Sequence, residues 1–68
     1  MKISVGYVVY QTDGTRLYRS KVTDIITVGE RIIYDTDSVA FDERAIGHSI
    51  FLTKEDAEAR MKELQDRL

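Results

Sequence analysis

Residues 24–34 read DIITVGERIIY, and this stretch decides the fold. Gly29 stands at the first central position of a tight turn, which predicts a two-residue hairpin loop of type II′. Ile26 then lies opposite Ile33 on one face of the hairpin, while Ile25 lies on the other face. Both faces are apolar, whereas a flat sheet with one buried side needs only one apolar face. The pattern therefore predicts a strand that bends from one sheet into another.

The fold we expect is mainly β (α+β), a small SH3-like half-barrel of four or five antiparallel strands with one C-terminal α-helix. Asp24 stands where a bulge could place the bend. The single domain spans residues 1–68, with strands at about 2–11, 16–28, 31–36, 39–41 and 49–52 and a helix at about 54–67. The alternative is a flat three-stranded sheet with the helix on one face. That fold would leave an exposed apolar patch at Tyr10, Leu17, Ile25, Ile32 and Tyr34.

The first hairpin is predicted from Asp13-Gly14, a strong signal for a two-residue loop. Such a loop places Val9 opposite Tyr18 and Val5 opposite Val22, on the face we assign to the core.

The C-terminal segment predicts an amphipathic helix. Thr53 is a candidate N-cap, with acidic residues in the first turn that follows. A narrow apolar stripe recurs at helical spacing. Its members are Ala57, Met61, Leu64 and Leu68. The stripe is expected to dock on the sheet or close one end of the barrel; the alternative is that it pairs with a second copy of the chain.

Composition narrows the possible functions. The chain has 68 residues, no cysteine and a net charge of −2, so it is expected to form one small domain without disulfides. The acidic balance argues against binding to double-stranded nucleic acid. No apolar run is long enough to cross a membrane, and no export signal is evident, so a cytoplasmic location is expected.

No catalytic residue, metal site or cofactor is expected. His48 is the only histidine, and its neighbour Ser49 would point to the opposite face of an extended segment. The densest acidic cluster consists of Asp35, Asp37, Asp42 and Glu43. Its spacing lacks the glycine and glutamate of a calcium-binding loop. Two roles are therefore left open for this cluster: its carboxylates keep the strand ends soluble, or they mimic phosphate groups.

Binding is the function that the remaining residues favour. Tyr10, Leu17 and Arg19 lie on one predicted face and combine aromatic, apolar and basic groups, as protein interfaces do. Arg16, Arg19 and Lys21 form a small basic patch beside aromatic side chains, which can also hold a nucleotide. These five residues are the predicted binding site.

A resemblance adds a genetic setting. It rests on Tyr18-x-Ser20-Lys21-Val22, Phe41-x-Glu43 and residues 46–58, IGHSIFLTKEDAE. The chain resembles small proteins common in phages and prophages of Gram-positive bacteria, which run from a strand-rich front into a short charged helix. The resemblance implies a fold and a phage origin but no activity. Some tiny phage proteins block host defences by binding a nuclease or trapping a signalling nucleotide.

We therefore expect a non-enzymatic, phage-encoded protein that acts in the host cytoplasm by protein–protein interaction. Inhibition of a host or defence protein is one form that this interaction could take. The alternative is an oligomeric binder of a nucleotide or another small anionic ligand, as in counter-defence sponges. In that case the chain forms a homo-oligomer with sites between subunits.

Overall fold

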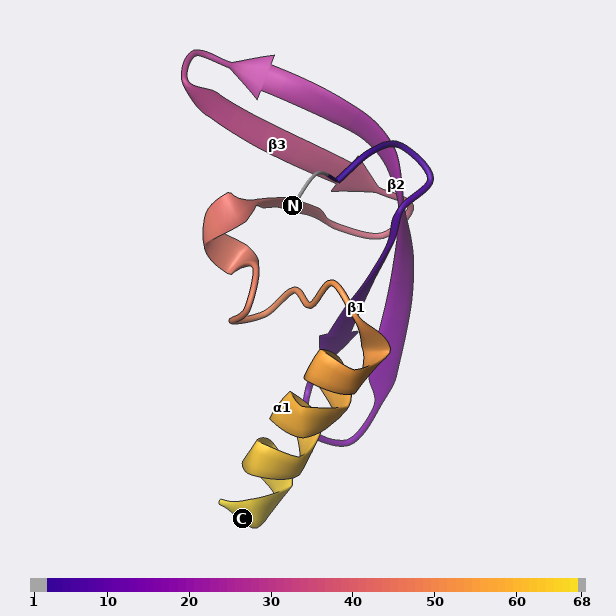
Figure 1. Cartoon of the computed structure of the whole chain (residues 1–68), viewed down its shortest axis with the longest axis vertical. Helices are drawn as coiled ribbons and strands as arrows, with labels where there is room; N and C mark the ends of the chain where they lie inside the picture. The colour runs from indigo at the N-terminus through magenta and orange to yellow at the C-terminus, as the bar shows by residue number, and fades with distance from the viewer. Residues whose placement is uncertain (1–2, 68) are drawn as a thin grey trace.

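The structure is a computed structural model that describes residues 3–67. In chain order its elements are β1 (Val8–Thr12), β2 (Leu17–Val28), β3 (Arg31–Thr36), β4 (Ala40–Asp42), the short 3₁₀ helix η1 (Glu43–Ala45) and α1 (Lys54–Asp66). The strands form one antiparallel sheet in the order β1-β2-β3-β4. The sheet curls into a half-barrel, and α1 packs mainly against β1 (Figure 1). The predicted fold class is confirmed.

The bend lies in the middle of β2. Its first half pairs with β1 and its second half with β3, and the register with β3 shifts between Val22 and Asp24. Thr23 is therefore an extra residue, a β-bulge at the predicted place. The second hairpin also has the predicted register, with Ile26 opposite Ile33. Gly29 has a φ of 62°. Among the described residues only glycines have a positive φ, so Glu30, the second central residue of the turn, does not. The turn therefore fits type II′.

The predicted register of the first hairpin is wrong by two residues. Val9 lies opposite Ser20, and Thr12 lies opposite Leu17. The connection is longer than expected because the Asp13 carboxylate accepts hydrogen bonds from the backbone N–H groups of Thr15 and Arg16, at 2.9 and 3.0 Å. A slip of two residues keeps the side chains of the paired strands on their predicted faces, since the side-chain period of a strand is two. The predicted core position of Val5 is wrong, because Val5 precedes β1 and is 61% exposed.

Of the five predicted strands, the one at 31–36 has the predicted bounds, three have different bounds and one does not form; the strand expected at 16–28 begins at Leu17. The strand expected at 2–11 begins at Val8, because the Tyr7 N–H bonds to the Ser4 carbonyl and forms a turn; Lys2 lies outside the described residues. The strand expected at 39–41 is shifted to Ala40–Asp42. The strand expected at 49–52 does not form. That segment makes only isolated bridges, notably two reciprocal backbone bonds of 2.8 Å between Phe51 and Tyr10. It lies between a turn at Gly47 and the start of α1, which leaves no room for a ladder.

The core lies inside the curl of the sheet. Its buried members are Ile3, Val9, Val22, Tyr34, Phe41 and Ile50. The rings of Tyr34 and Phe41 stack across β3 and β4 with centroids 5.2 Å apart. The burial of Tyr34 excludes the flat alternative, which would have exposed it.

Helix α1 begins as predicted. The Thr53 hydroxyl accepts a hydrogen bond from the backbone N–H of Asp56 at 3.2 Å, which caps the helix. Ala57 is fully buried, and Met61 and Leu64 are half-buried, so the described part of the apolar stripe docks on the protein. Leu68 lies outside the described residues.

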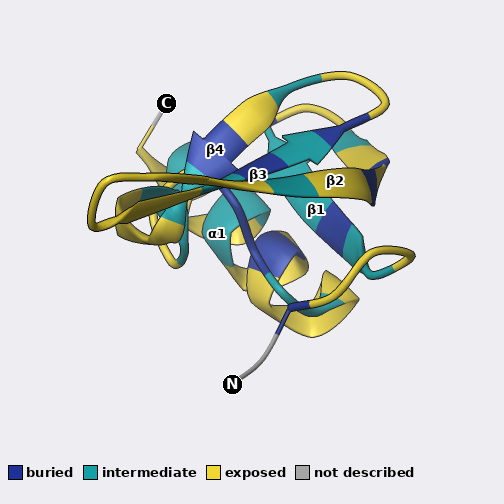
Figure 2. Cartoon of the chain, turned by 90° about the horizontal axis from the view of Figure 1, so that it is seen from above, coloured by how far each residue is buried: buried dark blue, intermediate teal, exposed yellow. Residues whose placement is uncertain are grey.

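The tip of the β2–β3 hairpin stands away from this core. Ile26, Val28 and Ile32 are 42%, 57% and 37% exposed, respectively. Figure 2 shows the tip as a projection of exposed residues. The two apolar faces of the hairpin are thus buried only near the bend, because the half-barrel does not extend to the tip.

Candidate functional site

A hollow of about 230 Å³ opens beside the first hairpin and the start of α1. Its lining residues are Tyr10, Leu17, Tyr18, Arg19 and Lys54. We call this site the tyrosine hollow. Tyr10 of β1 lies directly opposite Arg19 of β2, and the register places Leu17 two residues from Arg19 on the same face. The structure therefore brings together three of the five predicted binding residues.

The charges of the tyrosine hollow are all positive. Arg19 and Lys54 line it, and no carboxylate of the described chain does. The three ion pairs among residues 3–67 involve other cations. A charged group with no counter-charge attracts an anion, and Leu17 and the phenol ring of Tyr10, which has a polar tip, offer apolar surface beside the cations. The arrangement suits a ligand that is partly apolar and carries negative charge.

Two lining residues were missed from the sequence. Lys54 reaches the hollow because the bond pair between Tyr10 and Phe51 holds the start of α1 beside β1. The predicted cap at Thr53 placed Lys54 at a helix start, but nothing in the sequence said which strand that start would meet. The sequence places Tyr18 on the core face opposite Val9, yet it is 44% exposed, because its true partner is Gln11, next to the turn of the first hairpin and away from the core.

The other two predicted binding residues do not line the tyrosine hollow. Lys21 lies opposite Val8, nearer the bend, and its backbone N–H donates to the Asp37 carboxylate at 3.3 Å. Arg16 belongs to the turn, where its carbonyl accepts a hydrogen bond from the Thr12 hydroxyl at 2.7 Å. The basic patch expected from Arg16, Arg19 and Lys21 is therefore spread along β2 rather than gathered at one site.

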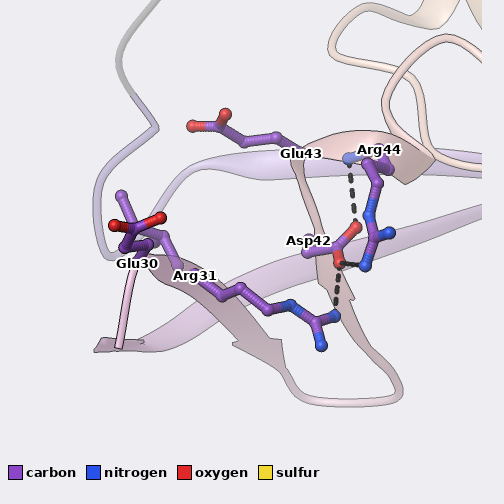
Figure 3. A pocket seen from close by; sticks show the side chains of 6 residues that line it. Glu30, Arg31, Asp42, Glu43 and Arg44 are labelled. Atoms are coloured by element: carbon purple, nitrogen blue, oxygen red, sulfur yellow. Dashed lines mark hydrogen bonds and ion pairs between the residues drawn. The ribbon is translucent and has the colours of Figure 1, made fainter. Parts of the chain in front are cut away.

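A second hollow, of about 310 Å³, lies between the tip of the β2–β3 hairpin and η1. Figure 3 shows its centre, where the Asp42 carboxylate faces two guanidinium groups. One oxygen of Asp42 accepts from Arg31 at 2.7 Å and from Arg44 at 3.2 Å, and the other accepts the backbone N–H of Arg44. The hydrogen bond from Arg31, followed by the contacts with Arg44, holds the pKa of Asp42 below its ordinary value. Because both arginines donate to one carboxylate, we interpret this group as a clasp between the hairpin and β4.

The fold separates members of the acidic cluster that are close in the sequence. Asp42 belongs to the clasp, while Asp37 accepts the backbone N–H of Lys21 in another loop. Within residues 3–67 no three His, Cys, Asp or Glu side chains are placed to hold a metal ion. His48 is an exposed turn residue whose backbone N–H bonds to the Ala45 carbonyl at 3.1 Å.

Comparison of the chain with protein-family models, with characterised proteins and with solved structures finds no match. The resemblance to small phage proteins thus stays a prediction. Among the described residues no helix is long and apolar enough to cross a bilayer.

Proposed function

We propose that this chain is a non-enzymatic binding protein that captures an acidic segment of a protein partner at the tyrosine hollow. The observation that supports this function is the meeting of Arg19 and Lys54 with two tyrosines and a leucine around one open hollow. Tyrosine and arginine are enriched among residues that dominate binding energy at protein interfaces. The two cations speed the encounter with an acidic partner, and the apolar walls hold it.

A nucleotide is the second candidate ligand. The same hollow offers cations for phosphate and the phenol ring of Tyr10 for a base, a combination found in sites for single-stranded nucleic acids. On the resemblance alone, we extend the proposal to a phage setting, in which the partner is a host or defence protein that the chain inhibits.

The test is an NMR titration of the labelled protein with a peptide that contains alternating glutamate and phenylalanine. Shifts concentrated at Tyr10, Leu17, Tyr18, Arg19 and Lys54 are expected, together with weaker binding at higher salt. A parallel titration with ATP tests the second candidate, which requires the same residues to shift.

Charge-removing variants sharpen the test. Arg19→Gln and Lys54→Gln should each weaken peptide binding severalfold. Lys62→Gln removes the same charge from an exposed part of α1 outside the hollow and should leave binding unchanged. Equal loss in all three variants would mean that only net charge matters. Shifts confined to other residues would refute the site.

A further inference from the structure

The outer edge of β2 is open from the bulge to the tip of the second hairpin. β1 pairs with β2 only up to Lys21. The pairing continues by one residue, because the Val22 N–H donates to the Tyr7 carbonyl and the Val22 carbonyl accepts the Gly6 N–H. From Asp24 to Val28 the strand pairs with β3 alone. Figure 1 shows this part of β2 on the outside of the projecting hairpin. An open edge of this kind is a template for pairing with another strand.

The backbone groups on the open edge can be identified from the register. Val28 and Arg31 flank the two-residue loop and form a hydrogen-bonded pair, and hydrogen-bonded pairs alternate along an antiparallel ladder. The N–H and C=O groups of Ile25 and Thr27 therefore point away from β3. The structure agrees, since the Ile25 N–H is taken by the Asp24 carboxylate at 2.9 Å instead of by β3. The carbonyl of Ile25 and both groups of Thr27 remain for a partner strand.

We propose that a second copy of this chain pairs with this edge, antiparallel and about a two-fold axis at Ile26. The regular open segment runs from Asp24 to Val28, and its centre is Ile26, so only this register overlaps all five residues. A register shifted toward the bulge would lose pairing at Thr23. A shift the other way would place Asp24 opposite Glu30 of the second copy, which sets like charges against each other.

The side chains complement themselves in this register. On one face, Ile26 of each copy lies opposite Ile26 of the other, and Ile33 lies on the outer side of each Ile26. These four side chains form an unbroken apolar row across the joined sheets. In the next row of the same face, Val28 lies opposite Asp24 of the second copy. Arg31, the partner of Val28 in its own hairpin, is thereby brought toward Asp24 and Asp35 of the second copy. The arrangement covers Ile26 and Val28, two of the most exposed apolar side chains of the described chain. It joins the two hairpins into one four-stranded sheet.

Two hydrogen bonds, from Thr27 of each copy to Ile25 of the other, form without disturbing Asp24. Two more form only if the Asp24 carboxylate releases the Ile25 N–H. The dimer is therefore expected to be dependent on concentration, and Asp24→Ala should strengthen it. This inference does not rest on the proposed function, because the tyrosine hollow lies on other residues.

Sedimentation velocity over a concentration series tests the dimer. A mass approaching twice the 7.8 kDa of one chain is expected at high concentration. Ile26→Lys should abolish the dimer, because it places two like charges face to face. Ile32→Lys makes the same change on β3, away from the paired edge, and should keep it. A wild-type chain that stays monomeric throughout the series would overturn the proposal.

Disulfide trapping tests the register. The chain has no cysteine, so a single substitution gives a unique thiol. Two Ile26→Cys side chains would face each other in a non-hydrogen-bonded pair, with Cα atoms roughly 4.5 Å apart, within the range for a disulfide. Two Val28→Cys side chains would lie about four residues apart along the strands, well beyond the ~7 Å limit.

Ile26→Cys should therefore form a crosslinked dimer under mild oxidation, and Val28→Cys should not. Val28 is the more exposed of the two, so random collision would favour it. Equal or faster crosslinking of Val28→Cys would refute the register.

Discussion

Gly14 and Leu64 meet so closely that a methyl group on Gly14 would lie 3.2 Å from the Leu64 Cβ. Gly14 lies at the turn between β1 and β2, and Leu64 lies in the last turns of α1. The carbonyl of Gly14 also accepts a hydrogen bond from the Gln65 side chain at 2.9 Å. The turn therefore reverses the chain and also forms part of the surface against which α1 packs.

Gly14→Ala should destabilise the protein more than Gly6→Ala does. Both glycines have nearly the same positive φ, 98° and 96°, so both variants incur a strain of about 1–2 kcal/mol. No atom lies within 4 Å of a methyl group on Gly6, whereas on Gly14 the helix must shift as well, which adds about 1–3 kcal/mol.

Urea unfolding of the two variants measures this difference. Shortening Leu64 should not rescue Gly14→Ala, since the close contact is with the Cβ atom itself. Equal loss in both glycine variants would show that the helix does not rest on the turn.

The second prediction concerns the Asp13 carboxylate of the same turn. Its pKa is held well below the ordinary range by hydrogen bonds from the Thr15 backbone N–H, then from the Thr15 hydroxyl and the Arg16 N–H. A carboxyl with a lowered pKa in the folded state stabilises it fully above the unfolded pKa of about 3.9 and loses that effect as pH falls below it. Asp13→Asn should therefore lower stability at neutral pH and weaken the loss of stability in acid.

Thermal unfolding between neutral pH and acid tests this behaviour. Asp66→Asn removes a carboxylate from the exposed end of α1 and serves as the control. If Asp13→Asn keeps the wild-type pH dependence, the turn carboxylate does not contribute to acid sensitivity.

These turns mark how far the sequence alone could predict the structure. The second hairpin was predictable because glycine at the first central position selects one loop length, and the loop length sets the pairing of Ile26 with Ile33. The first hairpin contains an equally strong signal, but the side chains of Thr12 and Asp13 stabilise a longer connection. Competing hydrogen bonds of this kind depend on backbone geometry that local sequence patterns do not encode.

The candidate site was only partly predictable for a related reason. Tyr10, Leu17 and Arg19 share a face through strand periodicity, which sequence shows directly. Lys54 joins them through a single bridge between Tyr10 and Phe51, a contact between distant parts of the chain. The exposed hairpin tip was not foreseen, because periodicity shows that both faces are apolar but not how far the half-barrel extends.

The third prediction concerns the clasp around Asp42. Arg31 donates to the carboxylate at 2.7 Å and Arg44 at 3.2 Å, and the Arg44 side chain is the more exposed of the two, at 79% against 60%. Arg31→Gln should therefore raise the pKa of Asp42 toward its ordinary value more than Arg44→Gln does.

NMR titration of the Asp42 carboxyl carbon measures both shifts directly. The exposed Arg67→Gln is a charge-matched control at the far end of α1. A larger effect from Arg44→Gln would reverse the proposed order of the two contacts.

The fourth prediction concerns Thr36, a buried residue whose hydroxyl organises the turn between β3 and β4. It accepts the backbone N–H groups of Ser38 and Val39, at 3.1 and 2.8 Å, and donates to the Val39 carbonyl. Thr36→Val keeps the shape but leaves these groups without their partner, so it should cost about 1–3 kcal/mol. Thr36→Ser keeps the hydroxyl and loses one methyl group, worth about 0.8 kcal/mol. Urea unfolding should therefore rank Thr36→Ser above Thr36→Val, and hydrogen exchange at Val39 should quicken only in Thr36→Val. The opposite ranking would mean that packing of the methyl group, rather than the hydroxyl, holds the turn that starts β4.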